Sequence, residues 1–375
     1  MAKYPLDNVE IQGFRGLKVL RLEELGLINI LVGENNCGKT SVLEALSILC
    51  QAFNPLQWLT VARTRDAGGL DESVLYSLRW FFDQNNLFMN FEETFKGGCK
   101  MLVSGRFELR SLTVEYCESI YDLSQKEIDE NDWFKSLGTS DLIKKGPWKG
   151  SQIIHHVVAE GNTNINTYQF QIWDFKIESD QFKDARRNIS TVMLNAHAFQ
   201  INPLLVSIVS RNSFDNSGNF IQKLIGTFDS EIRKINVASF RGFRPSVYVQ
   251  HDRLGVAPLS IFGDGFRRVV LIANEMIKLK GGGVLLIDEI EAGIHVKALK
   301  KVFSWLVNVA RELNVQVFVT THSLEALDAI LASSSDNLDD TAAYHLSPST
   351  NETRVKRFSG ELLNRIRGES GLDVR

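Results

Sequence analysis

The chain has 375 residues, of which 44% are hydrophobic and 23% are charged, as in an ordinary soluble protein of one large domain or two smaller ones. Its formal net charge of −3 excludes a uniformly basic protein that coats nucleic acid. The sequence lacks a bilayer-spanning apolar run of roughly 18 residues, a signal-peptide core, and any metal or disulfide spacing among its four cysteines, which predicts a cytoplasmic protein with reduced thiols and no membrane partner.

The first elements in chain order are strands that lead into a glycine-rich loop. Residues 17–22 alternate apolar and polar side chains, the period of a half-buried strand. Residues 27–32 form a denser apolar run, which is typical of a buried strand. A glycine-rich stretch follows, and apolar residues at helical spacing then continue to Cys50. The order is therefore strand, loop, helix.

The middle of the chain predicts a separate antiparallel sheet. Apolar and polar residues alternate over the stretches 105–116, 153–158 and 167–177, which indicates strands with one face in water. The polar stretch 118–150 between them predicts a loop. No heptad repeat runs through this section, so we expect no coiled coil.

The last third of the chain alternates helices and strands. Helices are predicted over residues 219–235, 265–280, 297–313 and 323–331, and strands over residues 245–250, 284–287 and 315–319. This alternation is typical of a parallel sheet covered by helices. The predicted fold class is therefore α/β, with an N-terminal antiparallel β subdomain and a mainly parallel core sheet flanked by helices.

The strongest motif is a phosphate-binding loop with the pattern GxxxxGK[ST]. Its glycines allow backbone N–H groups to curl around phosphates, and the following helix N-terminus adds positive potential. The lysine would reach the β- and γ-phosphates, and the threonine hydroxyl would bind Mg²⁺. The motif consists of Gly33, Glu34, Asn35, Asn36, Cys37, Gly38, Lys39 and Thr40.

Two further motifs follow buried strands of the last third. Asp288 and Glu289 end the apolar run 284–287, where Asp288 fits as the Mg²⁺ carboxylate and Glu289 as the group that polarises the attacking water. His322 follows the strand 315–319, one strand–helix–strand unit later. The side chains of both motifs should therefore lie at the ligand-binding edge of the sheet, where His322 would sense the γ-phosphate.

A second glycine turn, Gly263-Asp264-Gly265, opens the helix 265–280. A helix N-terminus of this kind also binds phosphate. The competing interpretation is an ordinary turn in which Asp264 caps the helix.

These motifs together resemble the ATP-binding-cassette (ABC) ATPase head, a P-loop NTPase, in its RecF, SMC and OLD-like branch. The resemblance rests on the order of Walker A loop, signature turn, Walker B strand and switch histidine, and on the opening VEIQGFRGL. The ending ESGLDVR resembles that of stand-alone ATPases related to OLD nucleases. The resemblance implies a head-to-tail homodimer with ATP and Mg²⁺, in which ATP lies between the Walker motifs of one subunit and the signature turn of the other.

The resemblance also implies individual site residues. Arg15 would lie close to the nucleotide, and Ser41 would join the phosphate loop in binding it. The family's signature is Leu-Ser-Gly-Gly-Gln, whereas this chain has Ser260 displaced from its turn, so the role of Ser260 stays open. Gln51 and Gln57 are both candidates for the family's Q-loop glutamine.

The predicted organisation is a single ATPase head over residues 1–375. It comprises a family-variable insertion at 52–218, a signature, Walker B and switch lobe at 219–332, and a C-terminal tail at 333–375. The chain beyond Leu331 is too short for the nuclease domain of OLD proteins, so we expect no nuclease activity.

The expected function is an ATP-driven dimeric switch that ATP closes and hydrolysis opens. By analogy with the family, the switch would control DNA or a separate effector protein such as a nuclease or toxin, in bacterial anti-phage defence. The alternative is a RecF-like ATP-dependent DNA-binding clamp in DNA repair, which requires a basic stripe rather than a merely solvated face. Candidates for that stripe are Lys183, Arg186, Arg187, Arg241, Arg244 and Arg253.

Overall fold

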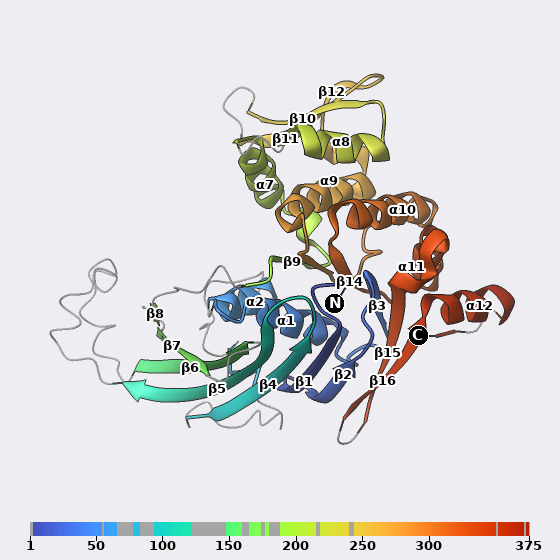
Figure 1. Cartoon of the computed structure of the whole chain (residues 1–375). Helices are drawn as coiled ribbons and strands as arrows, with labels where there is room; N and C mark the ends of the chain where they lie inside the picture. Colours follow the sequence, from blue (N-terminus) through green and yellow to red (C-terminus); the bar gives the residue numbers. More distant parts are fainter. Residues whose placement is uncertain are drawn as a thin grey trace.

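The computed structural model describes most of the chain, and its strands form three sheets (Figure 1). The described residues are 3–54, 56–65, 78–82, 94–121, 148–159, 165–173, 177–179, 188–214, 218–239, 244–349, 352–370 and 373–374. Within these ranges no helix is long and apolar enough to cross a membrane.

The elements alternate in type along the chain, and Figure 1 labels most of them. The strands are β1 Asn8–Phe14, β2 Leu17–Leu22, β3 Ile28–Val32, β4 Lys96–Ser104, β5 Leu109–Tyr121, β6 Trp148–Ala159, β7 Asn166–Trp173, β8 Ile177–Ser179, β9 Thr191–Leu194, β10 Ile232–Ala238, β11 Ser246–His251, β12 Gly255–Pro258, β13 Val284–Ile287, β14 Gln316–Thr320, β15 Thr341–Pro348 and β16 Thr353–Ser359. The α-helices are α1 Lys39–Cys50, α2 Gln57–Arg65, α7 Asn202–Phe214, α8 Gly218–Phe228, α9 Asp264–Met276, α10 Val296–Leu313, α11 Leu324–Ser333 and α12 Gly360–Ser370, and the 3-10 helices are η2 Ala198–Gln200, η3 Leu259–Phe262, η4 Ile277–Leu279 and η5 Ser335–Asp340.

The core sheet has the order β16-β15-β3-β14-β13-β9, and only β16 runs antiparallel to its neighbour. Every residue of β3, β13 and β14 is buried, which explains why these strands are mainly apolar rather than alternating in sequence. Ile287 of β13 pairs with Val319 of β14. The predicted mainly parallel core is confirmed, and the ends of these strands meet at one edge.

The C-terminal segment is part of this core rather than a tail. Residues 341–348 form β15, which pairs in parallel with β3, and residues 353–359 form β16, which pairs with β15. The segment predicted as a C-terminal tail, residues 333–375, thus supplies two strands of the core sheet. Ala342, Ala343 and Tyr344 are buried, so the pairing with β3 also buries apolar area.

The antiparallel sheet has the order β2-β1-β4-β5-β6-β7-β8. Fully buried residues alternate with less buried ones along residues 8–12 of β1 and 151–159 of β6, which confirms the predicted sheet with one wet face. The strand predicted over 105–116 begins only at Leu109, and β4 was not predicted because its glycines and lysines hide the alternation. Helices α1 and α2 lie against this sheet (Figure 1).

A third sheet, β10-β11-β12, forms a lobe with α7 and α8, above α9 in Figure 1. The helix predicted over 219–235 ends at Phe228, and residues 232–235 belong to β10. The chain turns between them because the Asp229 side chain accepts a hydrogen bond from the Glu231 backbone N–H at 3.1 Å.

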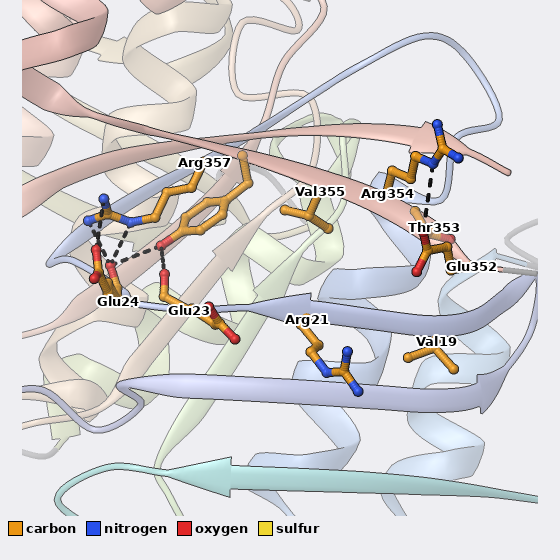
Figure 2. Close-up of a pocket in the computed structure, with 10 residues that line it drawn as sticks. Val19, Arg21, Glu23, Glu24, Glu352, Thr353, Arg354, Val355 and Arg357 are labelled. Atoms are coloured by element: carbon orange, nitrogen blue, oxygen red, sulfur yellow. Dashed lines mark hydrogen bonds and ion pairs between the residues drawn. The ribbon is translucent and has the colours of Figure 1, made fainter.

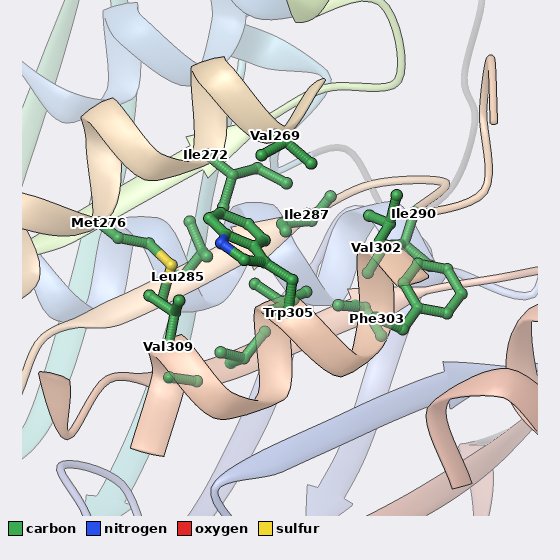
Figure 3. Close-up of a cluster of buried hydrophobic side chains, with 14 of the residues drawn as sticks. Val269, Ile272, Met276, Leu285, Ile287, Ile290, Val302, Phe303, Trp305 and Val309 are labelled. Carbon is green, nitrogen blue, oxygen red and sulfur yellow. The ribbon is translucent and has the colours of Figure 1, made fainter. Parts of the chain in front are cut away.

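Hydrophobic side chains fill both faces of the core sheet. On one face α9 and α10 pack over β13, with Ile272, Leu285 and Trp305 in contact (Figure 3). The Trp305 indole N–H donates to the Leu224 carbonyl at 2.7 Å, which also joins α10 to α8. This rigid core fixes the strand ends that carry the predicted site.

The buried His155 of β6 makes the stability of the fold depend on pH. Trp58 Nε1 donates to His155 Nε2 at 2.7 Å, so Nδ1 carries the proton and donates to the Ala52 carbonyl at 2.8 Å. Burial lowers the pKa of His155 from 6.5 to about 4. The neutral ring therefore stabilises the fold fully above pH 6.5, and this contribution of about 3 kcal/mol is lost as pH falls toward 4.

We expect the urea midpoint of the wild-type chain to fall more steeply between pH 7 and pH 4.5 than that of His155→Gln. Glutamine retains a donor and an acceptor but does not titrate in this range. Fluorescence-monitored urea unfolding at several pH values measures the difference. Parallel pH profiles for the two proteins would contradict the assignment.

Candidate nucleotide-binding site

A pocket of about 720 Å³ lies at the edge of the core sheet where β3, β9 and β13 end. This is the edge at which open α/β sheets bind ligands. Its walls combine the glycine-rich loop, the residues after β9 and β13, and the β15–β16 hairpin. The lining residues are Gly16, Leu17, Asn35, Asn36, Cys37, Gly38, Lys39, Thr40, Ser41, Glu44, Met193, Asn195, Asp288, Glu289, His322, Pro348 and Thr353.

The glycine-rich loop wraps around the N-terminus of α1. Gly33 and Gly38 have φ values of 142° and 99°, which L side chains rarely adopt. A Cβ on Gly33 would lie 2.4 Å from the Leu346 carbonyl oxygen of β15, so the loop packs directly on the C-terminal hairpin. Lys39 Nζ crosses the loop and donates to the Gly33 and Glu34 carbonyls at 2.8 and 2.7 Å.

Oxygen ligands suited to Mg²⁺ meet between α1 and β13. Thr40 Oγ1 lies 3.1 Å from each carboxylate oxygen of Asp288, although the two residues are far apart in sequence. The Thr320 hydroxyl donates to Asp288 Oδ1 at 2.6 Å and accepts from the Glu289 N–H at 2.8 Å. Hydroxyl and carboxylate oxygens beside a phosphate loop fit this cation. Thr320 was not predicted, although its place before His322 at a strand end was the available signal.

Glu289 and His322 both line the pocket, as predicted. Glu289 has a φ of 45°, a sparsely populated conformation for a residue with a side chain. The His322 N–H donates to Glu291 Oε1 at 2.8 Å. The loops after β13 and β14 are thus tied together at the pocket.

A buried arginine that was not predicted supports the loop after β13. Arg268 of α9 is 2% exposed and donates to the carbonyls of Ala292, Asp288 and Glu289 at 2.7, 3.1 and 2.9 Å. Burial lowers the pKa of Arg268 to about 10, so the guanidinium remains charged at neutral pH. An arginine amid the apolar residues of the helix was the signal for such a role.

Other predicted residues lie beside the pocket rather than in its lining. Arg15 pairs with Glu44 through Nε and Oε2 at 2.9 Å, and its guanidinium carbon lies 4.3 Å from the centre of the Phe81 ring. Glu44 lines the pocket, so Arg15 lies one residue behind it. Gly33 and Glu34 do not line the pocket themselves, but their carbonyls accept hydrogen bonds from Lys39, which does.

Neither candidate glutamine reaches the pocket. Gln51 donates to the Ile189 carbonyl at 2.9 Å and Gln57 to the Ser47 hydroxyl at 2.8 Å. Asn195 instead lines the pocket just after β9. It was missed because β9 is short and only one of its residues is buried.

The second glycine turn is not among the residues that line the pocket of its own chain. Gly263 has a φ of 79° and precedes the first residue of α9, and Gly263 and Ser260 are both exposed. Asp264 pairs with Arg267 at 3.2 Å. The predicted residues Ser260, Gly263, Asp264 and Gly265 are thus presented at a surface.

A second groove, of about 510 Å³, lies between the edge strands β2 and β16 (Figure 2). Its arginines have acidic partners: Arg357 pairs with Glu24 at 3.0 Å and Arg354 with Glu352 at 3.6 Å. This balanced charge is less suited to polyphosphate than the Lys39 loop.

The cluster of Asp229, Glu231 and His251 has the residue types of a metal site, but its chemistry does not fit one. His251 Nδ1 accepts a hydrogen bond from the Arg253 backbone N–H at 3.1 Å. In the neutral ring Nε2 then carries the proton and faces the carboxylates, so it has no lone pair for a metal.

Comparisons with known proteins cover most of the chain. A family model described as "AAA domain, putative AbiEii toxin, Type IV TA system" matches residues 28–328, a range that includes the glycine-rich loop, Asn195, Asp288 and His322. The "ATP/GTP phosphatase" of Helicobacter pylori is 22% identical over 343 residues, which are 87% of each chain.

Two further comparisons give a short match in sequence and a match in structure at low sequence identity. The "DNA replication and repair protein RecF" of Saccharophagus degradans is 42% identical over 50 residues, and the match spans 13% of this chain and 14% of that protein. A solved Smc head domain bound to the C-terminal domain of ScpA, derived from Pyrococcus furiosus, has a TM-score of 0.48 at 10% identity and covers 98% of this chain and 100% of that chain.

Proposed function

The chain belongs to the AAA domain family described as putative AbiEii toxin, Type IV TA system, and has the ABC-type ATPase head of the RecF/SMC-like branch; from this premise we propose that it binds and hydrolyses ATP as a dimeric switch. One observation carries the proposal. Thr40 of the phosphate loop contacts both oxygens of Asp288 at 3.1 Å, which unites the two halves of a Mg²⁺·ATP site.

Five side chains of the pocket and the backbone of its phosphate loop then have roles in hydrolysis. The loop N–H groups and Lys39 bind the phosphates, while Thr40 and Asp288 hold Mg²⁺. When bound, Mg²⁺ would supply charge neutralisation for the phosphates. Glu289 polarises the attacking water, and His322 orients the γ-phosphate from the neighbouring strand end.

The signature turn acts on the other subunit's nucleotide in this proposal. Gly263 and Gly265 lie at the N-terminus of a 13-residue helix, which favours phosphate through its unpaired N–H groups and dipole. The turn does not line its own chain's pocket. A head-to-tail dimer would bring two such turns to two pockets, and ATP would then hold the subunits together.

The output of the switch is proposed to be a separate effector, a nuclease or toxin, in anti-phage defence, with DNA as a further candidate partner. The family description itself names a toxin system. A DNA clamp has less support. Four of its six candidate residues, Lys183, Arg186, Arg187 and Arg241, lie outside the described residues, and Arg253 pairs with Glu231.

Mixing two inactive variants tests the shared site. Lys39→Ala removes the phosphate-binding ammonium, and Gly265→Arg fills the signature turn; a Cβ at Gly265 comes only within 3.8 Å of Ile294 Cγ2, so the fold has room for it. Each variant alone should be inactive in phosphate release. An equal mixture should recover about a quarter of the wild-type rate, because mixed dimers keep one intact site.

Binding of a fluorescent ATP analogue serves as the control for this experiment. Gly265→Arg should bind the analogue as the wild type does, and Lys39→Ala should not. A mixture that stays inactive, although both variants are folded, would overturn the shared site. Loss of analogue binding by Gly265→Arg would show that the turn is only structural.

A further inference from the structure

Gly293 lies where three segments meet. Its φ is 72°, and a Cβ placed on it would lie 2.5 Å from Phe199 Cζ and 3.3 Å from Asp264 Cβ. A contact of 2.5 Å to a buried ring cannot be relieved by a small side-chain shift. The loop after β13, the turn η2 and the start of α9 are therefore packed around this glycine.

Phe199 provides the aromatic side of this junction. It is 1% exposed and belongs to η2, which follows Asn195 by only a few residues. The Arg268 guanidinium carbon lies 5.4 Å from the centre of the Phe199 ring, within cation–π range. Phe199 thus touches both α9 and the loop after β13, on a segment whose start lines the nucleotide pocket.

The same loop and helix are joined on their other side. Arg268 donates to three carbonyls of the loop, and a Cβ on Gly265 would contact Ile294 at 3.8 Å. The signature turn and the loop after β13 therefore have little freedom to move separately. Any displacement of η2 must reach both through the Phe199 ring.

We propose that Phe199 is a positioning residue that couples nucleotide occupancy of the pocket, which Asn195 lines, to the orientation of the signature turn. The inference rests on the proposed function, because the signature turn matters only if it serves a second subunit. Phe199 itself does not line the pocket. Its loss should therefore spare nucleotide binding and impair the steps that need the turn.

Phe199→Leu tests the coupling. We expect binding of a fluorescent ATP analogue within about 3-fold of wild type, with ATP-dependent dimerisation and phosphate release reduced by about 10-fold or more. The matched control is Phe303→Leu, another fully buried phenylalanine, which lies on α10 in the same hydrophobic core (Figure 3). That variant should lose stability but keep the wild-type ratio of hydrolysis to binding.

A double-mutant cycle keeps the test decisive if Phe199→Leu is unstable. In the wild-type background, Gly293→Ala should severely impair hydrolysis. In the Phe199→Leu background the same substitution should cost much less, because the Cζ atom with which the new Cβ would clash is absent. Equal ratios of hydrolysis to binding in Phe199→Leu and Phe303→Leu, or additive effects in the cycle, would overturn the inference. Failure of the proposed function would differ, since the wild type would then form no dimer with ATP.

Discussion

Glu289→Gln is expected to lower ATP hydrolysis by about 10²- to 10⁴-fold while preserving ATP binding. Glu289 lines the pocket beside Asp288, and its backbone N–H is fixed by the Thr320 hydroxyl at 2.8 Å. Glutamine has the same shape but cannot accept the proton of an attacking water. The variant should therefore accumulate as an ATP-bound dimer, which light scattering after gel filtration with Mg²⁺ and ATP would detect.

The control for this variant is Glu312→Gln, the same chemical change on the exposed surface of α10. It should hydrolyse ATP at the wild-type rate and show the wild-type balance of monomer and dimer. A Glu289→Gln protein that binds ATP yet elutes only as a monomer would argue against a nucleotide-held dimer. Hydrolysis at the wild-type rate would remove Glu289 from the mechanism.

The second large effect is expected for Arg268→Met, which should destabilise the chain by about 3–5 kcal/mol. The substitution fills similar space but leaves the carbonyls of Asp288, Glu289 and Ala292 without their buried donor. Because these carbonyls belong to the loop that carries Asp288 and Glu289, the carboxylates proposed to act in hydrolysis, ATP hydrolysis should fall as well. Urea unfolding gives the free energy, and phosphate release below the transition gives the activity.

Two neighbouring changes make the Arg268 experiment specific. Arg268→Lys keeps the charge, but one ammonium cannot reproduce the fork geometry, so we expect a loss between those of the wild type and the methionine variant. Arg267→Met removes the next arginine, which pairs with Asp264 at 3.2 Å, and should cost less than Arg268→Met because the Asp264 side chain is 40% exposed. Similar losses for Arg267→Met and Arg268→Met would show that the buried carbonyl contacts contribute little.

The sequence predicted those parts of the site that depend on local patterns. The phosphate loop is a contiguous motif, and β13 and β14 are buried on both faces, so Asp288 and His322 could be placed at one sheet edge from their spacing. Asn195 and Arg268 could not be found in this way. Their roles depend on which short strand joins the sheet and which carbonyls face a helix, and both are set by tertiary packing.

The C-terminal strands show the same limit. Nothing local in residues 341–348 distinguishes an edge hairpin from a neighbour of β3, because the partner lies near the other end of the chain. The helix predicted over 219–235 was too long for a related reason. Its helical pattern continued past Phe228, whereas pairing with β11 makes residues 232–238 a strand.

The position of β3 has a consequence for how the protein is made. This strand leads into the phosphate loop, yet its two neighbours in the sheet are β14 and β15. A ribosome therefore releases the loop long before residues 316–348 exist to enclose it. The nascent chain must keep a largely apolar strand unpaired until β14 and β15 have been synthesised, and contacts of such large sequence separation form slowly. Nucleotide-binding competence should thus appear late in synthesis and abruptly, once the last strands have been added.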